Sequence, residues 1–364
     1  MPNSRITTVL AADDRYSRPL AATIQSIISR LRPGRELDLY LCDIGISAQN
    51  REIIQTVTDH AAVRAQWVSS LRKQVEHLPQ IWPGISRAAY ARLYIPAVLP
   101  PEIDRALYLD CDLIVRRCIG DLFDSPMGDF AAMCVADAAS PYVSSPYGVP
   151  YWSRFGRRAD DVNFNSGVFL MNLPIWRNED LAGAAFKYLT DGRHHFMVDQ
   201  EAINAVLPGR IGQLDPRWNQ QTEHLQPLYE AMLPYGEEVV RELIEDPWIV
   251  HFTTGIKAWS YQSTHPFREE WFKSLDETPY RGWRPSRSEY LAGRAGRRLE
   301  RAKERLGASR RTGRAAAGLL LRVCSWGRGY NQALRPAAGA FGAGDQRPRR
   351  VGAPVWRWNR FAVR

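Results

Sequence analysis

The first seventy residues alternate between strand-like and helix-like patterns, and this alternation limits the fold more than any other feature. Ile6–Leu10 and Leu37–Leu41 have the apolar content of strands, and Val63–Val68 is a candidate third strand. Between them, Pro19–Leu31 carries apolar residues at helical spacing, and Ser47 is suited to cap a second helix. The pattern predicts an α/β fold with a mostly parallel, doubly wound sheet, which binds ligands beyond the carboxyl ends of its strands.

Later segments extend the same pattern along the chain. Ala106–Asp110 alternates like a strand, and Asn165–Asn172 reads as a buried one. The other expected elements are a helix around Arg87–Tyr94, one from about Leu181, a short helix over Asp199–Val206 and a last strand over Trp248–His251. We therefore expect one catalytic domain over residues 1–278, followed by an extension over residues 279–364.

The extension differs from the rest of the chain in charge. Residues 281–364 hold 21 Lys and Arg against 4 Asp and Glu, a charge of +17, which leaves −8 for residues 1–280. Its arginines are interleaved with Trp326, Trp356 and Trp358. We expect a basic, helical or partly disordered tail at an anionic membrane surface, because arginines pair with headgroups and indole rings prefer the interface.

Two other interpretations of the tail stay open. A solvated extension without a partner explains the composition about as well as a membrane contact does. Nucleic acid is a third possible partner, since Lys and Arg neutralise phosphates. We do not expect nucleic acid, because residues 1–280 are acidic and the chain has no recognised nucleic-acid motif.

Cysteine use and hydropathy indicate the compartment. The five cysteines are odd in number and form no Cys-x-x-Cys pair, which fits a reducing cytoplasm. The apolar stretch Ile6–Ala12 is short and runs into Asp13, so no signal peptide is expected. No run approaches the roughly 20 apolar residues that a membrane span needs. We expect a cytoplasmic protein that binds peripherally to the inner face of the cytoplasmic membrane.

Asp110-Cys111-Asp112 ends the alternating stretch that begins at Arg105. Residues two apart in a strand point to the same side, so both carboxylates can face one cation. Hard divalent cations prefer oxygen ligands, and such a cation can hold a diphosphate. Asp-x-Asp also arises by chance, and on spacing alone an ordinary solvated turn is the better explanation.

Several common catalytic motifs are absent from the sequence. No Gly-x-Gly-x-x-Gly follows the first strand, which argues against a nicotinamide-dependent enzyme of the Rossmann type. The chain also lacks a Walker-type Gly-Lys-Ser/Thr, a His-Glu-x-x-His and a Gly-x-Ser-x-Gly. A nucleotide bound by this protein must therefore be held by a different kind of loop.

Six short blocks occur in a fixed order along the chain. They are Ala11–Tyr16, Tyr90–Leu93, Leu107–Asp112, Phe164–Gly167, Asp199-Gln200 and His251–Trp259. Together they resemble glycosyltransferase family 8, the retaining enzymes that include lipopolysaccharide α-galactosyl- and glucosyltransferases and glycogenin, over residues 5 to about 275. The resemblance implies the GT-A fold, a single Rossmann-like, mostly parallel mixed sheet with helices on both faces.

The resemblance implies that Asp110, Asp112 and His251 are the metal ligands. Two carboxylates and an imidazole, completed by diphosphate oxygens, suit Mn²⁺, with Mg²⁺ possible. A lone histidine at a strand end is usually an ordinary residue, and His251 stands out because Lys257 and Trp259 follow at the family's spacing. Lys257 would stabilise negative charge on the leaving group.

The resemblance also implies residues for the donor sugar nucleotide. Asp199 and Gln200 would flank the anomeric carbon and, with Lys257, act in catalysis. Without the resemblance, Asp13 is also explained as a helix cap and Arg92 as a surface arginine. The expected donor-binding residues are Ala11, Ala12, Asp13, Tyr16, Arg92, Asp110, Cys111, Asp137, Asn165, Ser166, Gly167, Gly255 and Lys257.

The implied reaction moves glucose or galactose from a UDP-sugar to an acceptor hydroxyl, with retention at the anomeric carbon. The implied acceptor is a lipopolysaccharide or another glycolipid or glycan. Because the amide of Gln200 is a poor nucleophile, we favour attack by the acceptor on the same face, and Asp199 remains a candidate for double displacement. The alternative is a degenerate domain that binds UDP-sugar without turnover and whose basic tail binds nucleic acid or another anionic polymer.

Overall fold

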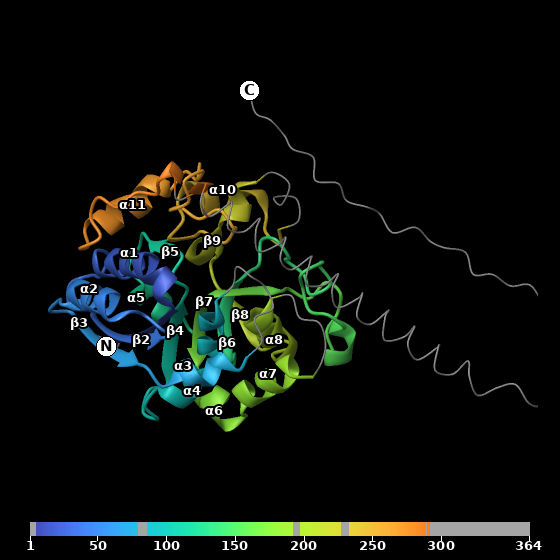
Figure 1. The fold of residues 1–364 in the computed structure, drawn as a ribbon. Helices are drawn as coiled ribbons and strands as arrows, with labels where there is room; N and C mark the ends of the chain where they lie inside the picture. The colour runs from blue at the N-terminus through green and yellow to red at the C-terminus, as the bar shows by residue number, and fades with distance from the viewer. Residues whose placement is uncertain (1–4, 79–85, 192–196, 227–232, 289, 292–364) are drawn as a thin grey trace, which may run out of the picture. The chain divides into compact units, whose positions relative to one another are not determined.

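The computed structural model describes residues 5–78, 86–191, 197–226, 233–288, 290 and 291 of the chain. Within them, seven strands form a sheet in the order β3-β2-β1-β4-β7-β6-β8, and three form a second sheet in the order β5-β10-β9 (Figure 1). These residues belong to one unit that extends to Gly293. The predicted boundary after residue 278 stays a prediction, and the tail from residue 292 onward lies outside the described residues.

The first three strands and the first two α-helices are those that the sequence predicts. They are β1 (Arg5–Ala12), α1 (Ser17–Ile28), β2 (Glu36–Asp43), α2 (Ala48–Thr58) and β3 (Val63–Val68). β2 pairs in parallel with β1 on one side and with β3 on the other. Ser47 caps α2 by accepting from the backbone N–H of Asn50, as expected. α1 ends before Leu31, because Arg30 and Leu31 donate to carbonyls three residues back and tighten the last turn.

The centre of the main sheet is mixed rather than parallel. β4 (Arg105–Leu109) lies parallel to β1, whereas β7 (Phe164–Asn172) runs antiparallel to both β4 and β6 (Ala132–Ala136). β8 (Ile211–Gln213) returns parallel to β6 at the edge. The sheet therefore matches the expected mostly parallel, mixed arrangement.

Helices cover both faces of this sheet (Figure 1). Along β1, Ile6 and Leu10 join the core beneath α1 and α2, while Val9 and Ala11 join the core on the opposite face. Because both faces are buried, the central strands are largely apolar, whereas the edge strand β3 alternates with the exposed Arg64 and Gln66. The opposite face is covered by α3 (Leu71–Glu76), α4 (Ala91–Val98), α6 (Leu173–Asn178), α7 (Leu181–Leu189) and α8 (Val198–Val206).

The helix expected around Arg87–Tyr94 differs in detail. It begins as the 3₁₀ helix η2 (Arg87–Tyr90) and continues as α4 through Pro96 to Val98. The proline lies near the end of the helix, where its missing N–H costs one backbone hydrogen bond. None of the described helices is both long and apolar enough to cross a membrane.

The second sheet adds elements that the sequence patterns do not predict. β10 (Ile249–His251), expected as the last strand, pairs antiparallel with β5 (Leu113–Val115) and parallel with β9 (Gln220–Gln221). α11 (Arg268–Asp276) packs on this sheet through Trp271 and Phe272. The remaining described helices are α5 (Gly120–Phe123), α10 (Glu237–Glu245) and the short 3₁₀ helices η1 (Asp14–Tyr16), η3 (Trp152–Phe155), η4 (Pro216–Asn219) and η5 (Thr222–Leu225).

The connection from β4 to β5 joins the two sheets and contains the Asp-x-Asp sequence. Thr23 of α1 fixes this connection from below, because its hydroxyl lies 2.9 Å from the Cys111 carbonyl oxygen and 2.8 Å from that of Leu113. The Cys111 thiol points away from the carboxylates and donates to the Ala11 carbonyl oxygen at 3.2 Å. Asp110 and Asp112 therefore flank a turn between two sheets and do not lie within one continuous strand.

Candidate functional site

A cleft of about 530 Å³ opens where β1 and β4 end and β7 begins. Since β7 is antiparallel to its neighbours, its first residues lie at the same edge as the carboxyl ends of the other strands. Among the residues that line the cleft are all the predicted site residues except Gly167. They are Ala11, Ala12, Asp13, Tyr16, Arg92, Asp110, Cys111, Asp112, Asp137, Asn165, Ser166, Asp199, Gln200, His251, Gly255 and Lys257.

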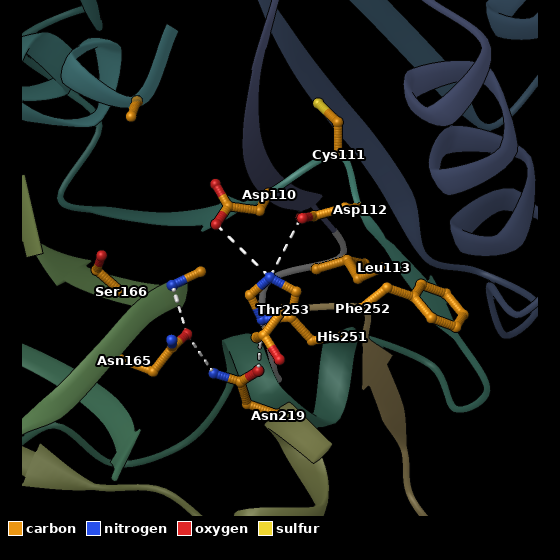
Figure 2. Close-up of polar contacts among 12 residues, drawn as sticks. Asp110, Cys111, Asp112, Leu113, Asn165, Ser166, Asn219, His251, Phe252 and Thr253 are labelled. Atoms are coloured by element: carbon orange, nitrogen blue, oxygen red, sulfur yellow. Dashed lines mark hydrogen bonds and ion pairs between the residues drawn. The ribbon is translucent and has the colours of Figure 1, made fainter. Parts of the chain in front are cut away.

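The three predicted metal ligands lie together at the centre of the cleft (Figure 2). Candidate ligand atoms of Asp110, Asp112 and His251 all lie within 4.8 Å of one another. His251 Nε2 is 3.2 Å from a carboxylate oxygen of Asp112 and 3.8 Å from one of Asp110. This donor set, with two hard oxygens and one imidazole nitrogen, fits a divalent cation such as Mn²⁺ or Mg²⁺.

Gly167 lies directly behind these ligands. A Cβ atom at this position would be 2.7 Å from Asp110 Oδ2 and would also overlap the His251 ring. Its carbonyl oxygen accepts from the backbone N–H of Asp110 at 2.8 Å. The glycine thus lets the start of β7 pack against the metal ligands. Unlike the other predicted site residues, Gly167 does not line the cleft.

Two cationic side chains, Lys257 and Arg92, pair with the carboxylates of the metal cluster. Lys257 Nζ lies 2.7 Å from Asp112 Oδ2 and also donates to the carbonyl oxygens of Phe252 and Thr253. Burial alone would raise the pKa of Asp112, but the charges of Lys257 and His251 hold that pKa well below its usual value. Asp112 is therefore an ionised ligand, and the predicted diphosphate partner Lys257 lies beside it.

Arg92 is buried, so the interpretation as a surface arginine is wrong. Its Nη2 donates to Asp110 at 2.7 Å, its Nε pairs with Asp199 at 2.8 Å, and its Nη1 donates to the carbonyl oxygen of Ser166 at 2.5 Å. Tyr108 adds a hydrogen bond from its hydroxyl to Asp110 at 2.9 Å. The guanidinium thus links a metal ligand to the predicted catalytic region of α8.

The two predicted catalytic residues of α8 are held by neighbouring groups. The Gln200 amide nitrogen donates to Asp137 at 3.0 Å, and its oxygen accepts from the Ser166 N–H at 3.2 Å. Burial raises the pKa of Asp199 to about 6, although Arg92 opposes the shift. Both side chains line the cleft, and neither is free of polar contacts.

At the opposite end of the cleft, Asp13 is the helix cap that the sequence allowed, and its expected contact with the donor stays a prediction. Its side chain caps η1 by accepting from the backbone N–H of Arg15, and it lines the cleft. Ser86 donates to its second oxygen at 2.7 Å, and the Arg15 side chain folds back onto the same carboxylate. Tyr16, also in the lining, packs edge-on against Trp259.

Sequence reasoning missed several residues of the site. Tyr108 has a usable signal, because it precedes Asp110 by two positions and so points to the same side of β4. Asn219, which contacts His251, has no such signal, since it ends the four-residue helix η4 just before a two-residue strand. Glu223 and Thr253 also line the cleft and hydrogen-bond to each other.

Comparisons with known proteins agree on one family. The family model of Glycosyl transferase family 8 matches residues 7–263. General stress protein A of Bacillus subtilis (strain 168) is 29% identical over 276 residues, which cover 75% of this chain and 93% of that protein. Glycosyltransferase GlyD of Streptococcus pneumoniae serotype 4 is 26% identical over 294 residues, which cover 74% of this chain and 30% of that protein.

Solved structures agree on the fold. The galactosyltransferase LgtC, in complex with donor and acceptor sugar analogues, matches with a TM-score of 0.63 and 23% identity, over 75% of this chain and 96% of its own. The bifunctional glycosyltransferase WbbM matches with a TM-score of 0.66 and 20% identity, over 77% of this chain and 51% of its own. At these identities the likeness concerns architecture, and that architecture is the GT-A fold.

Replacing Gly167 with alanine tests the packing behind the metal ligands. We expect Gly167→Ala to weaken Mn²⁺ binding at least about tenfold, because the added methyl displaces Asp110 and the His251 ring. Calorimetric titration of the purified protein with Mn²⁺ measures the affinity. Gly236→Ala is the matched control, because its Cβ would meet open space. Equal affinities for both variants would contradict the packing role.

Asp199 predicts a specific pH dependence of stability. Its pKa is raised in the folded protein, so the folded state binds this proton more tightly than the unfolded state. The free energy of unfolding should therefore fall as the pH rises from about 4 to about 6, by about 1–3 kcal/mol relative to Asp199→Asn. Urea denaturation across this range measures the difference. Parallel curves for the wild type and the variant would refute it, and the exposed Asp160→Asn should follow the wild type.

Proposed function

This chain belongs to glycosyltransferase family 8, and from that membership we propose that it transfers a hexose from a UDP-sugar to a hydroxyl of a glycan or glycolipid, with retention at the anomeric carbon. The family, its glycosyltransferase relatives and the GT-A fold make the protein a glycosyltransferase. The observation that carries the proposal is the convergence of Asp110, Asp112, His251 and Lys257 in one cleft. The hexose is glucose or galactose.

The donor would lie along the cleft from Asp13 to Gln200. Asp13 and Tyr16 line the end where the uridine is proposed to bind, and Asp199 and Gln200 line the sugar end. The Asp110 cluster between them would hold a divalent cation, Mn²⁺ or Mg²⁺, which neutralises diphosphate charge when bound. This order of groups matches the order of uridine, diphosphate and hexose in the donor.

Lys257 is the residue that we propose contacts the leaving group. Its ammonium lies beside Asp112, on a stem that is partly exposed. A diphosphate at the cluster offers the same ammonium more negative charge than one carboxylate does. Lys257 would then stabilise the charge that develops on the departing UDP.

The polar contacts of α8 support attack by the acceptor on the same face as the leaving group. Asp199 is paired with Arg92 and accepts from Ser166, and both contacts are made by its Oδ2 oxygen. Gln200 carries an amide, which is a weak nucleophile, and Asp137 holds its nitrogen. In the proposed step, the acceptor oxygen bonds to the anomeric carbon while the bond to the diphosphate oxygen breaks, and the hydroxyl proton passes to a phosphate oxygen.

We also propose that the protein acts at a membrane surface. The charge of +17 on residues 281–364, with tryptophans among the arginines, supports binding of the tail to an anionic membrane surface. Each basic residue at such a surface contributes on the order of 1 kcal/mol, so a few contacts are enough for peripheral attachment. A protein held at the inner face of the cytoplasmic membrane would reach an acceptor that is carried on a lipid, such as a lipopolysaccharide.

A panel of UDP-sugars tests the catalytic proposal. With Mn²⁺ present, we expect UDP release from UDP-glucose or UDP-galactose, and a loss of about 100-fold or more in Asp112→Ala, because a metal ligand is removed. Release of UDP in a coupled assay is the measurement. Asp160→Asn, an exposed aspartate on the surface, should behave as the wild type. Release that is independent of both metal and Asp112 would refute the proposed site.

Vesicle binding tests the role of the tail. The full chain should sediment with vesicles that contain anionic lipid and stay in solution with neutral ones, whereas a chain truncated after residue 284 should stay in solution with both. The reason is that the truncation removes nearly all of the basic segment. Sedimentation that survives the truncation would rule out the tail as the anchor. DNA binding by the full chain that weakens with salt would favour nucleic acid instead.

A further inference from the structure

Four buried side chains, those of His251, Asn219, Asn165 and Asp137, form a hydrogen-bond relay behind the metal cluster. Figure 2 shows the part of it from His251 through Asn219 to Asn165. The backbone N–H of Gly167 donates to one side-chain atom of Asn165 at 3.0 Å. A backbone N–H only donates, so this Asn165 atom is the amide oxygen. The same oxygen lies 3.0 Å from the Asn219 side chain, which must therefore present its nitrogen to Asn165.

This orientation leaves the Asn219 amide oxygen facing His251. The oxygen lies 2.9 Å from His251 Nδ1, and an amide oxygen only accepts hydrogen bonds. Nδ1 must therefore carry a hydrogen. In the neutral ring, the lone pair then lies on Nε2, which faces Asp110 and Asp112. Asn219 is fully buried and His251 nearly so, which shields the contact from competition with water.

The relay ends on a carboxylate. The Asn165 amide nitrogen donates to Asp137 Oδ2 at 3.1 Å, so each group from His251 to Asp137 donates to the next one along. Hydrogen bonds aligned in this way polarise one another. The array is thus a longer form of the carboxylate–histidine–metal arrangement, with two amides inserted between the carboxylate and the imidazole.

We propose that Asn219 is a positioning residue that holds His251 as its Nδ1–H tautomer, so that Nε2 presents its lone pair to the cation shared with Asp110 and Asp112. The inference rests on the proposed metal-dependent function. A cation between this lone pair and the two carboxylate oxygens stabilises the arrangement further, and the Asn219 acceptor favours the same tautomer before the cation binds. The relay therefore prepares the site for metal before any donor binds.

The tautomer of the wild-type ring is the first test. Nitrogen-15 NMR of the metal-free protein, recorded over a range of pH, reports which ring nitrogen of the neutral imidazole carries the hydrogen. We expect His251 in the Nδ1–H form. Finding the Nε2–H form would overturn the proposal, whatever the protein does with metal or donor.

Variants of Asn219 separate positioning from ordinary packing. Asn219→Leu keeps a similar volume but removes the acceptor, so we expect a mixed His251 tautomer and Mn²⁺ affinity that is about 10–100-fold weaker. Asn219→Asp keeps an oxygen for Nδ1–H and should retain the tautomer and an affinity within a few-fold of the wild type. Titration with Mn²⁺ alone, without any sugar nucleotide, measures the affinity.

A matched control is available in Asn204. This asparagine is also fully buried, but its side chain bonds only backbone atoms of Phe164 and Gln200. Asn204→Leu should lower the free energy of unfolding and leave the His251 tautomer unchanged. An equal loss of Mn²⁺ affinity in the leucine variants of both asparagines, or none in Asn219→Leu, would overturn the proposal.

The experiments distinguish a failure of the Asn219 role from a failure of the proposed metal dependence. If Asn219→Leu does not fold, the wild-type tautomer and Asn219→Asp still decide the role, because an aspartate variant that loses the Nδ1–H form refutes it. If the wild type binds no Mn²⁺, the proposed metal dependence fails. The NMR result then still decides whether Asn219 sets the state of His251.

Discussion

The cleft depends on the balance of charge among carboxylates that are buried or partly buried. An unpaired buried carboxylate costs several kcal/mol, and removing one partner of a buried pair is strongly destabilising. Here Arg92 lies between Asp110 and Asp199, and Lys257 lies beside Asp112. The acidic side chains can therefore lie close together, because fixed positive charge is already in place around them.

The two cations differ in how firmly they are held. The Arg92 guanidinium is buried and uses its planar set of donors on several groups at once, which fixes its position. Lys257 is a single charge on a flexible stem with part of its surface exposed. The arginine is thus part of the framework, whereas the lysine can change its contacts when a charged ligand arrives.

Much of the architecture was predictable from the sequence, because strands buried on both faces are rich in apolar residues and the helices between them carry apolar residues at a clear helical period. The direction of β7 was not, since an apolar strand has the same pattern in either orientation. The second sheet was also hidden, because β9 is only two residues long.

The same division holds within the site. Asp110, Asp112 and His251 were found because short blocks of neighbouring residues mark them. Asn219 was missed because its role comes from a contact across the fold, and nothing in its local sequence distinguishes it from an ordinary turn residue. Contacts between distant segments carry the information that a local pattern lacks.

The metal cluster joins residues that are far apart in the chain. Asp112 and His251 are 139 positions apart in the sequence. Asp112 directly precedes β5, and His251 is the last residue of β10, the strand that pairs with β5 in the second sheet. During synthesis, β5 leaves the ribosome long before β10 has been made. Asp110 and Asp112 are therefore present before His251, the third ligand of the cluster. Competence for the cation should thus appear late and abruptly as the chain grows, once the segment that bears His251 has emerged and paired.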